Sequence, residues 1–119
     1  MSIKQIQSEK EYCNVTNNIL PTETESLIVV DYYTDSCAPC LAIAPKIHKL
    51  AADTHGDVKF YKINVDDFQN FKDLEHITNV PTFGFYKNGQ LIDTVIGANF
   101  ELVKSKIAYH KLKMNPRGY

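Results

Sequence analysis

The sequence predicts one α/β domain in which four helices flank a central mixed five-stranded sheet. Apolar, strand-like segments alternate with segments of helical periodicity, which is the pattern of parallel β-α-β crossovers. The Asn88-Gly89 pair separates two further apolar segments and suits a tight turn between antiparallel strands. The length of 119 residues is that of a single domain spanning 1–119. We expect its core at residues 3–112 and a tail at 113–119.

The N-terminal part of the chain is expected to supply two strands separated by a helix. Ile3–Ile6 is expected to form a short strand. Ser8 and Glu11 have the pattern of a capping box, which begins a helix that extends to about Leu20. Leu27–Tyr33 is a continuous apolar run rich in β-branched residues, which is typical of a central strand buried on both faces.

A helix is expected next, because Ile43, Ile47 and Leu50 recur at helical spacing. Pro45 lies inside this helix and should kink it, since proline has no N–H to donate. His55-Gly56-Asp57 is expected to end it.

The C-terminal part is expected to form a strand, a short helix marked by three apolar residues, a hairpin and a last helix. The strand is Val58–Val65, and the short helix carries Phe68, Phe71 and Leu74 and ends near Ile77. The hairpin pairs Phe83–Tyr86 with Leu91–Ile96, and the last helix is Phe100–Leu112. The order β-α-β-α-β-α-β-β-α follows.

Composition and charge narrow the classes of function. The chain is 44% hydrophobic and 23% charged, and its formal net charge is -1. A nucleic-acid-binding protein usually carries a basic excess, so no nucleic-acid partner is expected. The N-terminus lacks an apolar run of signal-peptide length, and no segment is long enough to span a membrane. We therefore expect a soluble cytoplasmic protein with no membrane partner, in a compartment that keeps thiols reduced.

The most informative motif is Ser36-Cys37-Ala38-Pro39-Cys40, between the central strand and the next helix. A cysteine at a helix N-terminus meets free N–H groups and the positive end of the helix dipole, which favour the thiolate. Pro39 suits the first helical turn. We expect Cys37 to be the exposed nucleophile and Cys40 to be the more buried resolving thiol, the two forming a redox-active disulfide.

Other readings of the cysteine pair stay open. Structural zinc needs four ligands, and the further candidates are isolated residues, namely Cys13, His48, His55, His76 and His110. An iron–sulfur cluster bridging two subunits, or a fold that serves only as a binding module, would also contain such a pair. We expect no metal and no cofactor.

Seven segments, in register over roughly residues 3–112, resemble the thioredoxin family. They are Val29–Tyr33 with Asp31 six residues before the first cysteine of the pair, Cys37–Cys40, Ile43–Pro45, Tyr61–Asp66, Val80–Phe83, Phe85–Gly89 and Val95–Ala98. The resemblance implies the family's fold and a protein-disulfide oxidoreductase that passes electrons from a thioredoxin-reductase-like or other dithiol donor to protein disulfides. It also implies a monomer.

The resemblance implies further site residues. Asp31 would be a buried proton acceptor for Cys40, and the positive charge of Lys62 would tune the pKa of Asp31. Pro81 would be cis, placing the Val80 backbone beside Cys37 for pairing with an extended substrate. The substrate-binding residues would be Ser36, Ala38, Pro39, Val80, Pro81, Thr82, Gly97 and Ala98.

The sequence departs from the family near the reactive pair. Ser36 stands where the family usually has tryptophan, and the chain has no tryptophan at all. Tyr33 likewise replaces a tryptophan, Ala38 a glycine, and Leu41 a common lysine. These changes predict altered partner recognition. They leave an oxidase, an isomerase or a protein with one dedicated partner as alternatives to a general reductant.

Overall fold

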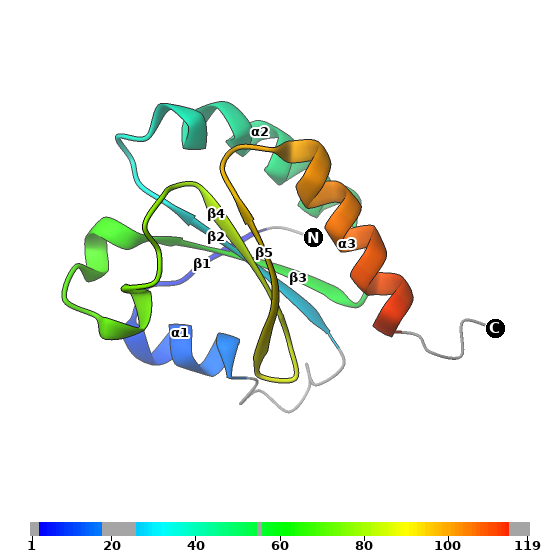
Figure 1. Cartoon of the computed structure of the whole chain (residues 1–119), viewed down its shortest axis with the longest axis horizontal. Helices are drawn as coiled ribbons and strands as arrows, with labels where there is room; N and C mark the ends of the chain where they lie inside the picture. The colour runs from blue at the N-terminus through cyan, green and yellow to red at the C-terminus, as the bar shows by residue number, and fades with distance from the viewer. Residues whose placement is uncertain (1–2, 18–25, 55, 115–119) are drawn as a thin grey trace.

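The computed structural model describes residues 3–17, 26–54 and 56–114, and the side chains among them up to residue 112. Five strands and three α-helices follow one another along these residues, with two 3₁₀ turns between β3 and β4 (Figure 1). They are β1 Lys4–Gln5, α1 Glu9–Thr16, β2 Leu27–Tyr33, α2 Ala38–Asp53, β3 Val58–Asn64, η2 Val65–Phe68, η3 Lys72–Leu74, β4 Thr82–Lys87, β5 Gln90–Ile96 and α3 Phe100–Met114.

The strands form one mixed sheet in the order β1-β3-β2-β4-β5. β1, β3 and β2 are parallel, whereas β4 is antiparallel to β2 and β5 is antiparallel to β4. The prediction of a central mixed five-stranded sheet is therefore confirmed. The apolar run of β2 occupies the middle of this sheet and is buried along all but its last residue, as its composition predicted.

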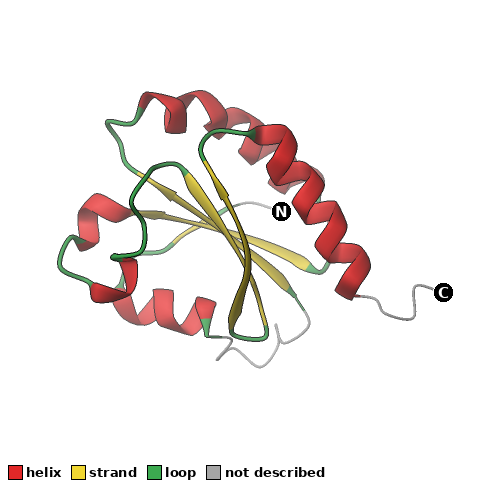
Figure 2. Ribbon diagram, in the orientation of Figure 1, coloured by secondary structure: helices red, strands yellow, loops and turns green. Residues whose placement is uncertain are grey.

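Helices cover both faces of the sheet (Figure 2), and each face carries its own apolar cluster. On one face, side chains of α2 and α3 such as Ile43, Ile47 and Val103 pack against Val29 and Phe83 of the sheet. On the other face, α1 and the 3₁₀ turns cover the sheet. Because side chains of a strand alternate between faces, Asp31 shares the α2 face with Val29.

The prediction of four helices is wrong, because the segment expected to form a helix near residues 68–77 forms the two 3₁₀ turns η2 and η3. Phe68, Phe71 and Leu74 are spaced by three residues, which is the repeat of a 3₁₀ helix rather than an α-helix. Asn64 also caps η2 by accepting a hydrogen bond from the Asp66 N–H at 3.0 Å.

Helix α1 begins as predicted but is shorter. The Glu11 N–H donates to Oγ of Ser8 at 3.0 Å, and the Gln7 N–H donates to Oε1 of Glu11 at 2.8 Å. The helix ends at Thr16 with Asn17 as its C-cap. The rest of the expected helix, to Leu20, lies outside the described residues.

The other predicted bounds are close to those observed. Pro45 lies inside α2, as expected, and that it bends the helix stays a prediction. The helix ends at Asp53, while His55 lies outside the described residues. α3 continues to Met114, so the first two residues of the expected tail are helical. None of the helices in the described ranges combines the length and apolar character needed to cross a bilayer.

The α1 face contains a buried group of three tyrosine hydroxyls. Tyr12 and Tyr32 lie 2.7 Å apart, Tyr12 and Tyr86 lie 3.3 Å apart, and the Tyr32 and Tyr86 hydroxyls also hydrogen-bond. Each hydroxyl has one proton to donate and can accept in return, so a closed ring satisfies all three without water. Burial raises the pKa of Tyr12 and Tyr32, which keeps both phenols neutral.

Candidate active site

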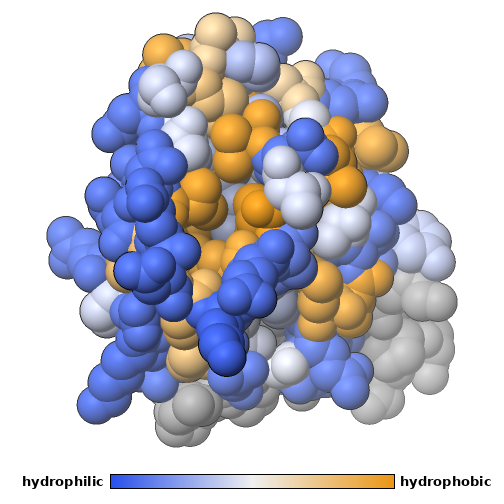
Figure 3. All heavy atoms as spheres, turned by 60° about the vertical axis from the view of Figure 1, so that its left-hand side comes forward, coloured by the Kyte–Doolittle hydropathy of each residue, from blue (hydrophilic) through white to orange (hydrophobic). Residues whose placement is uncertain are grey.

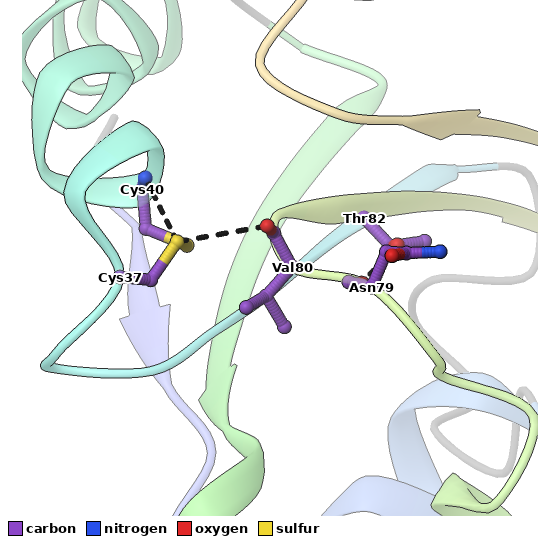
Figure 4. The surroundings of a disulfide bond; sticks show 5 residues. All are labelled: Cys37, Cys40, Asn79, Val80 and Thr82. Carbon is purple, nitrogen blue, oxygen red and sulfur yellow. Dashed lines mark hydrogen bonds between the residues drawn. A yellow bond between two sulfur atoms is a disulfide. The ribbon is translucent and has the colours of Figure 1, made fainter.

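The turn between β2 and α2 holds the cysteine pair. Cys37 is the N-cap of α2, with φ -88° and ψ 107°, and Pro39 lies in the first helical turn, where no N–H is needed. The Cys40 N–H donates to Sγ of Cys37 at 3.1 Å (Figure 4). The two sulfurs form a disulfide across a Cα–Cα distance of 5.2 Å. The predicted redox disulfide is thus formed at a helix N-terminus.

The two sulfurs differ in accessibility. Cys37 is half-buried, and its neighbours Ser36, Ala38 and Pro39 are exposed. Cys40 is only 5% exposed, because it points from the first turn of α2 toward the sheet. A second sulfur can therefore approach Cys37 from outside but not Cys40.

The loop before β4 faces the cysteine pair. The Val80–Pro81 peptide bond is cis, as the family resemblance implied. Sγ of Cys37 lies 3.6 Å from the carbonyl oxygen of Val80 (Figure 4), a contact in which a reduced thiol can donate. Oγ1 of Thr82 donates to the Asn79 carbonyl at 2.7 Å and so braces the loop. The structure brings together Cys37, Val80 and Pro81.

Gly97 follows β5 and lies beside the same loop. Its N–H donates to the Pro81 carbonyl at 2.8 Å, and its φ is +98°. A Cβ added at Gly97 would meet no heavy atom within 4 Å. Glycine is thus needed here for its backbone conformation, while the open space beside it is available to a partner. Ala98 is exposed at the same edge.

Replacing Gly97 with alanine is expected to lower the free energy of unfolding by about 1–2 kcal/mol, since a Cβ disfavours positive φ. Gly97→Asn is the matched control and should lose less, because asparagine tolerates positive φ better. Urea titration of the three proteins measures both effects. Equal stability of the alanine variant and the wild type would contradict the strain argument.

Asp31 lies in β2 beneath the cysteine pair and is 9% exposed. Burial raises the pKa of its carboxyl to about 7, and the positive charge of Lys62 offsets part of this effect. Lys62 is the register partner of Asp31 on β3. Its ammonium lies 5.7 Å from the centroid of the Tyr33 ring. Among the described residues, Oδ1 of Asp31 has no hydrogen-bond partner.

A cleft of about 190 Å³ runs from Asp31 to the surface. We call it the Asp31 cleft. Its lining includes Asp31, Tyr33, Cys40, Leu41, Ala44 and Lys62. Sequence reasoning missed this cleft. The available signal was the spacing of four residues that places Ala44 and His48 on the same side of α2 as Cys40.

The surface around the pair differs from what the family usually presents. Ser36 is exposed and offers little apolar area, whereas Leu41 is 63% exposed. The Tyr33 hydroxyl donates to Oε1 of Gln5 at 3.0 Å and so points toward β1. Figure 3 shows apolar side chains gathered near the centre and upper part of this side of the molecule, between hydrophilic ones.

Cys13, the third cysteine, is not brought to the pair. It is half-buried on α1, packs with the cluster on the α1 face, and its thiol donates to Oδ2 of Asp73 at 3.5 Å. Within the described ranges, no three His, Cys, Asp or Glu side chains gather in a way that could hold a metal ion.

These features define a thiol–disulfide oxidoreductase: an accessible sulfur at a helix N-terminus, a buried second sulfur in disulfide contact with it, and a buried carboxyl beneath them. The chain belongs to the thioredoxin family, whose family model matches residues 6–108. Its fold is accordingly the thioredoxin fold.

Several relatives are similar over nearly their whole length. Thioredoxin-2 of Saccharomyces cerevisiae is 34% identical over 106 residues, covering 89% of this chain and 96% of the relative. The thioredoxin of Ictalurus punctatus is 38% identical over 102 residues, covering 85% and 95%. The crystal structure of Malassezia sympodialis thioredoxin has a TM-score of 0.76 at 34% identity, covering 92% of this chain and 90% of that one.

Proposed function

We propose that this protein reduces protein disulfides, with Cys37 as the attacking sulfur and Cys40 as the resolving one. The observation that carries the proposal is the difference in accessibility of the two sulfurs at the start of α2. The N-cap position supports thiolate formation at Cys37, because the Cys40 N–H and the helix dipole favour negative charge there.

The reaction has two balanced exchange steps. The Cys37 thiolate attacks one sulfur of the substrate disulfide, forming a mixed disulfide and releasing the other substrate sulfur as thiolate. Cys40 then loses its proton and attacks Cys37. This step closes the Cys37–Cys40 disulfide and releases the second substrate sulfur. The substrate gains two electrons and the protein dithiol loses two.

Asp31 is proposed to accept the proton of Cys40 in the second step. Its carboxyl and Cys40 line the same cleft. A pKa of about 7 lets the carboxyl accept and return a proton near neutral pH. Lys62 keeps that pKa from rising further through its positive charge. The two sulfurs and this carboxyl suffice for the reaction without a metal or cofactor.

Substrate binding is proposed to use the surface around Cys37. An extended substrate segment would pair with the backbone at Val80, next to the attacking sulfur. The contact surface would be completed by Ser36, Ala38, Pro39, Gly97 and Ala98, whereas Pro81 and Thr82 are buried and would hold the Val80 backbone in place rather than contact the substrate with their side chains. We also propose that the protein acts as a monomer.

The direct test is reduction of insulin disulfides with dithiothreitol as the electron source. The wild type should accelerate insulin precipitation, whereas Cys37→Ser should match the rate with dithiothreitol alone, because the attacking sulfur is gone. Equal rates for the two proteins would overturn the proposal.

A second candidate function is oxidation or isomerisation of disulfides, or service to one dedicated partner. The exposed Ser36 and Leu41 favour it, because they change the surface beside the reactive sulfur. Equilibration with glutathione separates the candidates. A reduction potential near about -270 mV fits a reductant, and one of about -120 to -180 mV fits an oxidant or isomerase.

As a reductant, the protein would need a source of electrons. We propose a thioredoxin-reductase-like protein or another dithiol donor, in a cytoplasmic compartment that keeps thiols reduced.

A further inference from the structure

A second pocket lies on the α1 face of the sheet, between β5 and the segment that follows η3. We call it the β5 pocket. Its volume is about 200 Å³, and its lining includes Thr78, Thr82 and Ile96. The two threonines lie two residues to either side of Val80, whose carbonyl contacts the attacking sulfur, and Ile96 directly precedes Gly97. The pocket therefore begins where the proposed substrate surface ends, and the mechanism proposed above gives it no role.

The floor of the β5 pocket is apolar, because β4 contributes no side chain at Gly84. A Cβ added at Gly84 would lie 2.9 Å from Cε1 of Tyr86 and 3.3 Å from Cε1 of Tyr32. Both aromatic rings therefore reach across the glycine, and their hydroxyls hydrogen-bond to each other and to Tyr12. The floor thus consists mainly of ring carbons beside the Gly84 backbone.

The walls of the β5 pocket are apolar and reach the surface. Leu91 is 46% exposed and Ile96 is 65% exposed on β5, and Ile77 is half-buried on the segment opposite. Within the described residues, no Asp, Glu, Lys or Arg side chain lines the pocket, and the exposed His76 is its one imidazole. The pocket therefore suits a neutral apolar group, since a charged group would lose its hydration there without gaining a strong partner.

The size and position of the pocket determine which group fits and where a substrate would carry it. An apolar cavity of about 150 Å³ holds benzene, so a pocket of about 200 Å³ has room for one aromatic ring or one leucine side chain. An extended chain advances about 3.3 Å per residue. Because Thr78 is close to Val80 in the chain, a substrate segment paired with Val80 reaches the pocket within about two to four residues of its reactive cysteine.

We propose that the β5 pocket binds a large apolar side chain, phenylalanine or leucine, on the substrate segment that carries the reactive disulfide. This inference rests on the disulfide-reducing function proposed above and names a feature of its substrates. A segment held at Val80 already lies beside the mouth of the pocket, so one chain can engage both sites. Burial of its side chain removes apolar surface of both molecules from water, which strengthens substrate binding at the attacking sulfur.

The test compares peptide disulfides that carry phenylalanine, alanine or glutamate at one position, moved stepwise along the peptide on both sides of the cysteine. At one position within about four residues of the cysteine, kcat/KM should be about five- to tenfold higher for phenylalanine than for alanine, which is part of the effect of burying a whole ring. Glutamate should not exceed alanine at that position, because its charge loses hydration in the pocket.

Two substitutions on β5 locate the preference. Ile96→Ser removes one wall of the pocket and should lower the ratio of phenylalanine to alanine below about twofold. Ile92→Ser is the matched control, because Ile92 is 39% exposed on the same strand and does not line the pocket. It should keep the full preference. Since the ratio is measured within each variant, a general change in activity cancels.

The outcomes separate this inference from the function on which it rests. Equal rates for phenylalanine and alanine at every position would overturn the apolar subsite and leave the reductant intact. A preference that survives Ile96→Ser, or that Ile92→Ser removes as well, would place the contact elsewhere and also overturn it. A preference for glutamate would point to pairing with His76 and count against an apolar occupant. If no peptide is reduced, the proposed function fails and this inference fails with it.

A second measurement locates the side chain without turnover. The Cys40→Ser protein is joined through Cys37 to the phenylalanine peptide in a mixed disulfide, and the same adduct with the alanine peptide is the control. We expect the aromatic ring to shift the methyl proton resonances of Leu91 and Ile96 but not those of Ile92, because ring currents act only over short distances. Shifts of equal size at Ile92, or none at Leu91 and Ile96, would overturn the proposal.

Discussion

Replacing Asp31 with asparagine is expected to raise the free energy of unfolding by about 2–4 kcal/mol at about pH 8, where the wild-type carboxyl is ionised. Asp31 is 9% exposed, and its burial raises the pKa to about 7. Ionising it inside the protein is therefore much less favourable than ionising it in the unfolded chain. Asparagine has a similar shape and no charge, so it removes this penalty.

The sign of the pH dependence follows from proton binding. The pKa of the carboxyl is about 3.9 in an unfolded chain, and it is about 7 in the folded protein. Between these values the folded state holds a proton that the unfolded state has lost, so wild-type stability falls as the pH rises through this window. The advantage of Asp31→Asn should thus be small near pH 4 and complete above about pH 7.

Urea unfolding of the oxidised proteins at several pH values measures this effect. Asp57→Asn is the matched control, because Asp57 is exposed on the turn before β3. It should change stability by less than about 0.5 kcal/mol at every pH. The role of burial would be contradicted if Asp31→Asn raised the free energy of unfolding as much near pH 4 as at pH 8, or lowered it at pH 8. Its activity should fall, since Cys40 loses its proton acceptor.

Replacing Cys40 with serine is expected to abolish turnover while leaving the first exchange step intact. Cys37 remains accessible and can still attack a substrate disulfide. A serine hydroxyl cannot resolve the mixed disulfide, because thiol–disulfide exchange requires a sulfur nucleophile. Substrate should therefore remain bound to Cys37, and insulin reduction should drop to the level with dithiothreitol alone.

Mass spectrometry after brief mixing with a peptide disulfide detects the trapped adduct. Cys13→Ser is the control, since Cys13 lies on α1 and is held by Asp73 away from the pair. This variant should turn over at the wild-type rate and accumulate no adduct. Full turnover by Cys40→Ser, or an adduct on Cys40 in Cys37→Ser, would reverse the assignment of the two sulfurs.

The secondary structure was predictable where one physical signal dominated. Leu27–Tyr33 is apolar in character apart from Asp31, which favours burial on both faces of a sheet, and β2 is the middle strand. Asn88 and Gly89 form the turn between β4 and β5, and both have positive φ. At residues 65–77 the prediction of an α-helix was wrong, because apolar residues that recur every three positions belong to two 3₁₀ turns there.

The site was predictable only in part from the residues themselves. The Cys37–Cys40 spacing suggested a disulfide, but the cis bond before Pro81 came from the family resemblance, because few X-Pro bonds are cis. The four-residue spacing of Cys40, Ala44 and His48 indicated only the α2 wall of the Asp31 cleft. The rest of the cleft depends on how Tyr33 turns toward Gln5 and how α2 packs on the sheet, and these are tertiary arrangements.

The hydrogen bond from the Cys40 N–H to Sγ of Cys37 links electron transfer to the folding of α2. A helix cap that carries charge is stronger than a neutral one, so the thiolate holds the first turn more firmly than the disulfide does. By thermodynamic linkage, the helix then favours the reduced protein. Each 1.4 kcal/mol by which the cap favours the dithiol raises the midpoint potential by about 30 mV. The first turn of α2 is therefore a place where substitutions can tune redox poise without touching either sulfur.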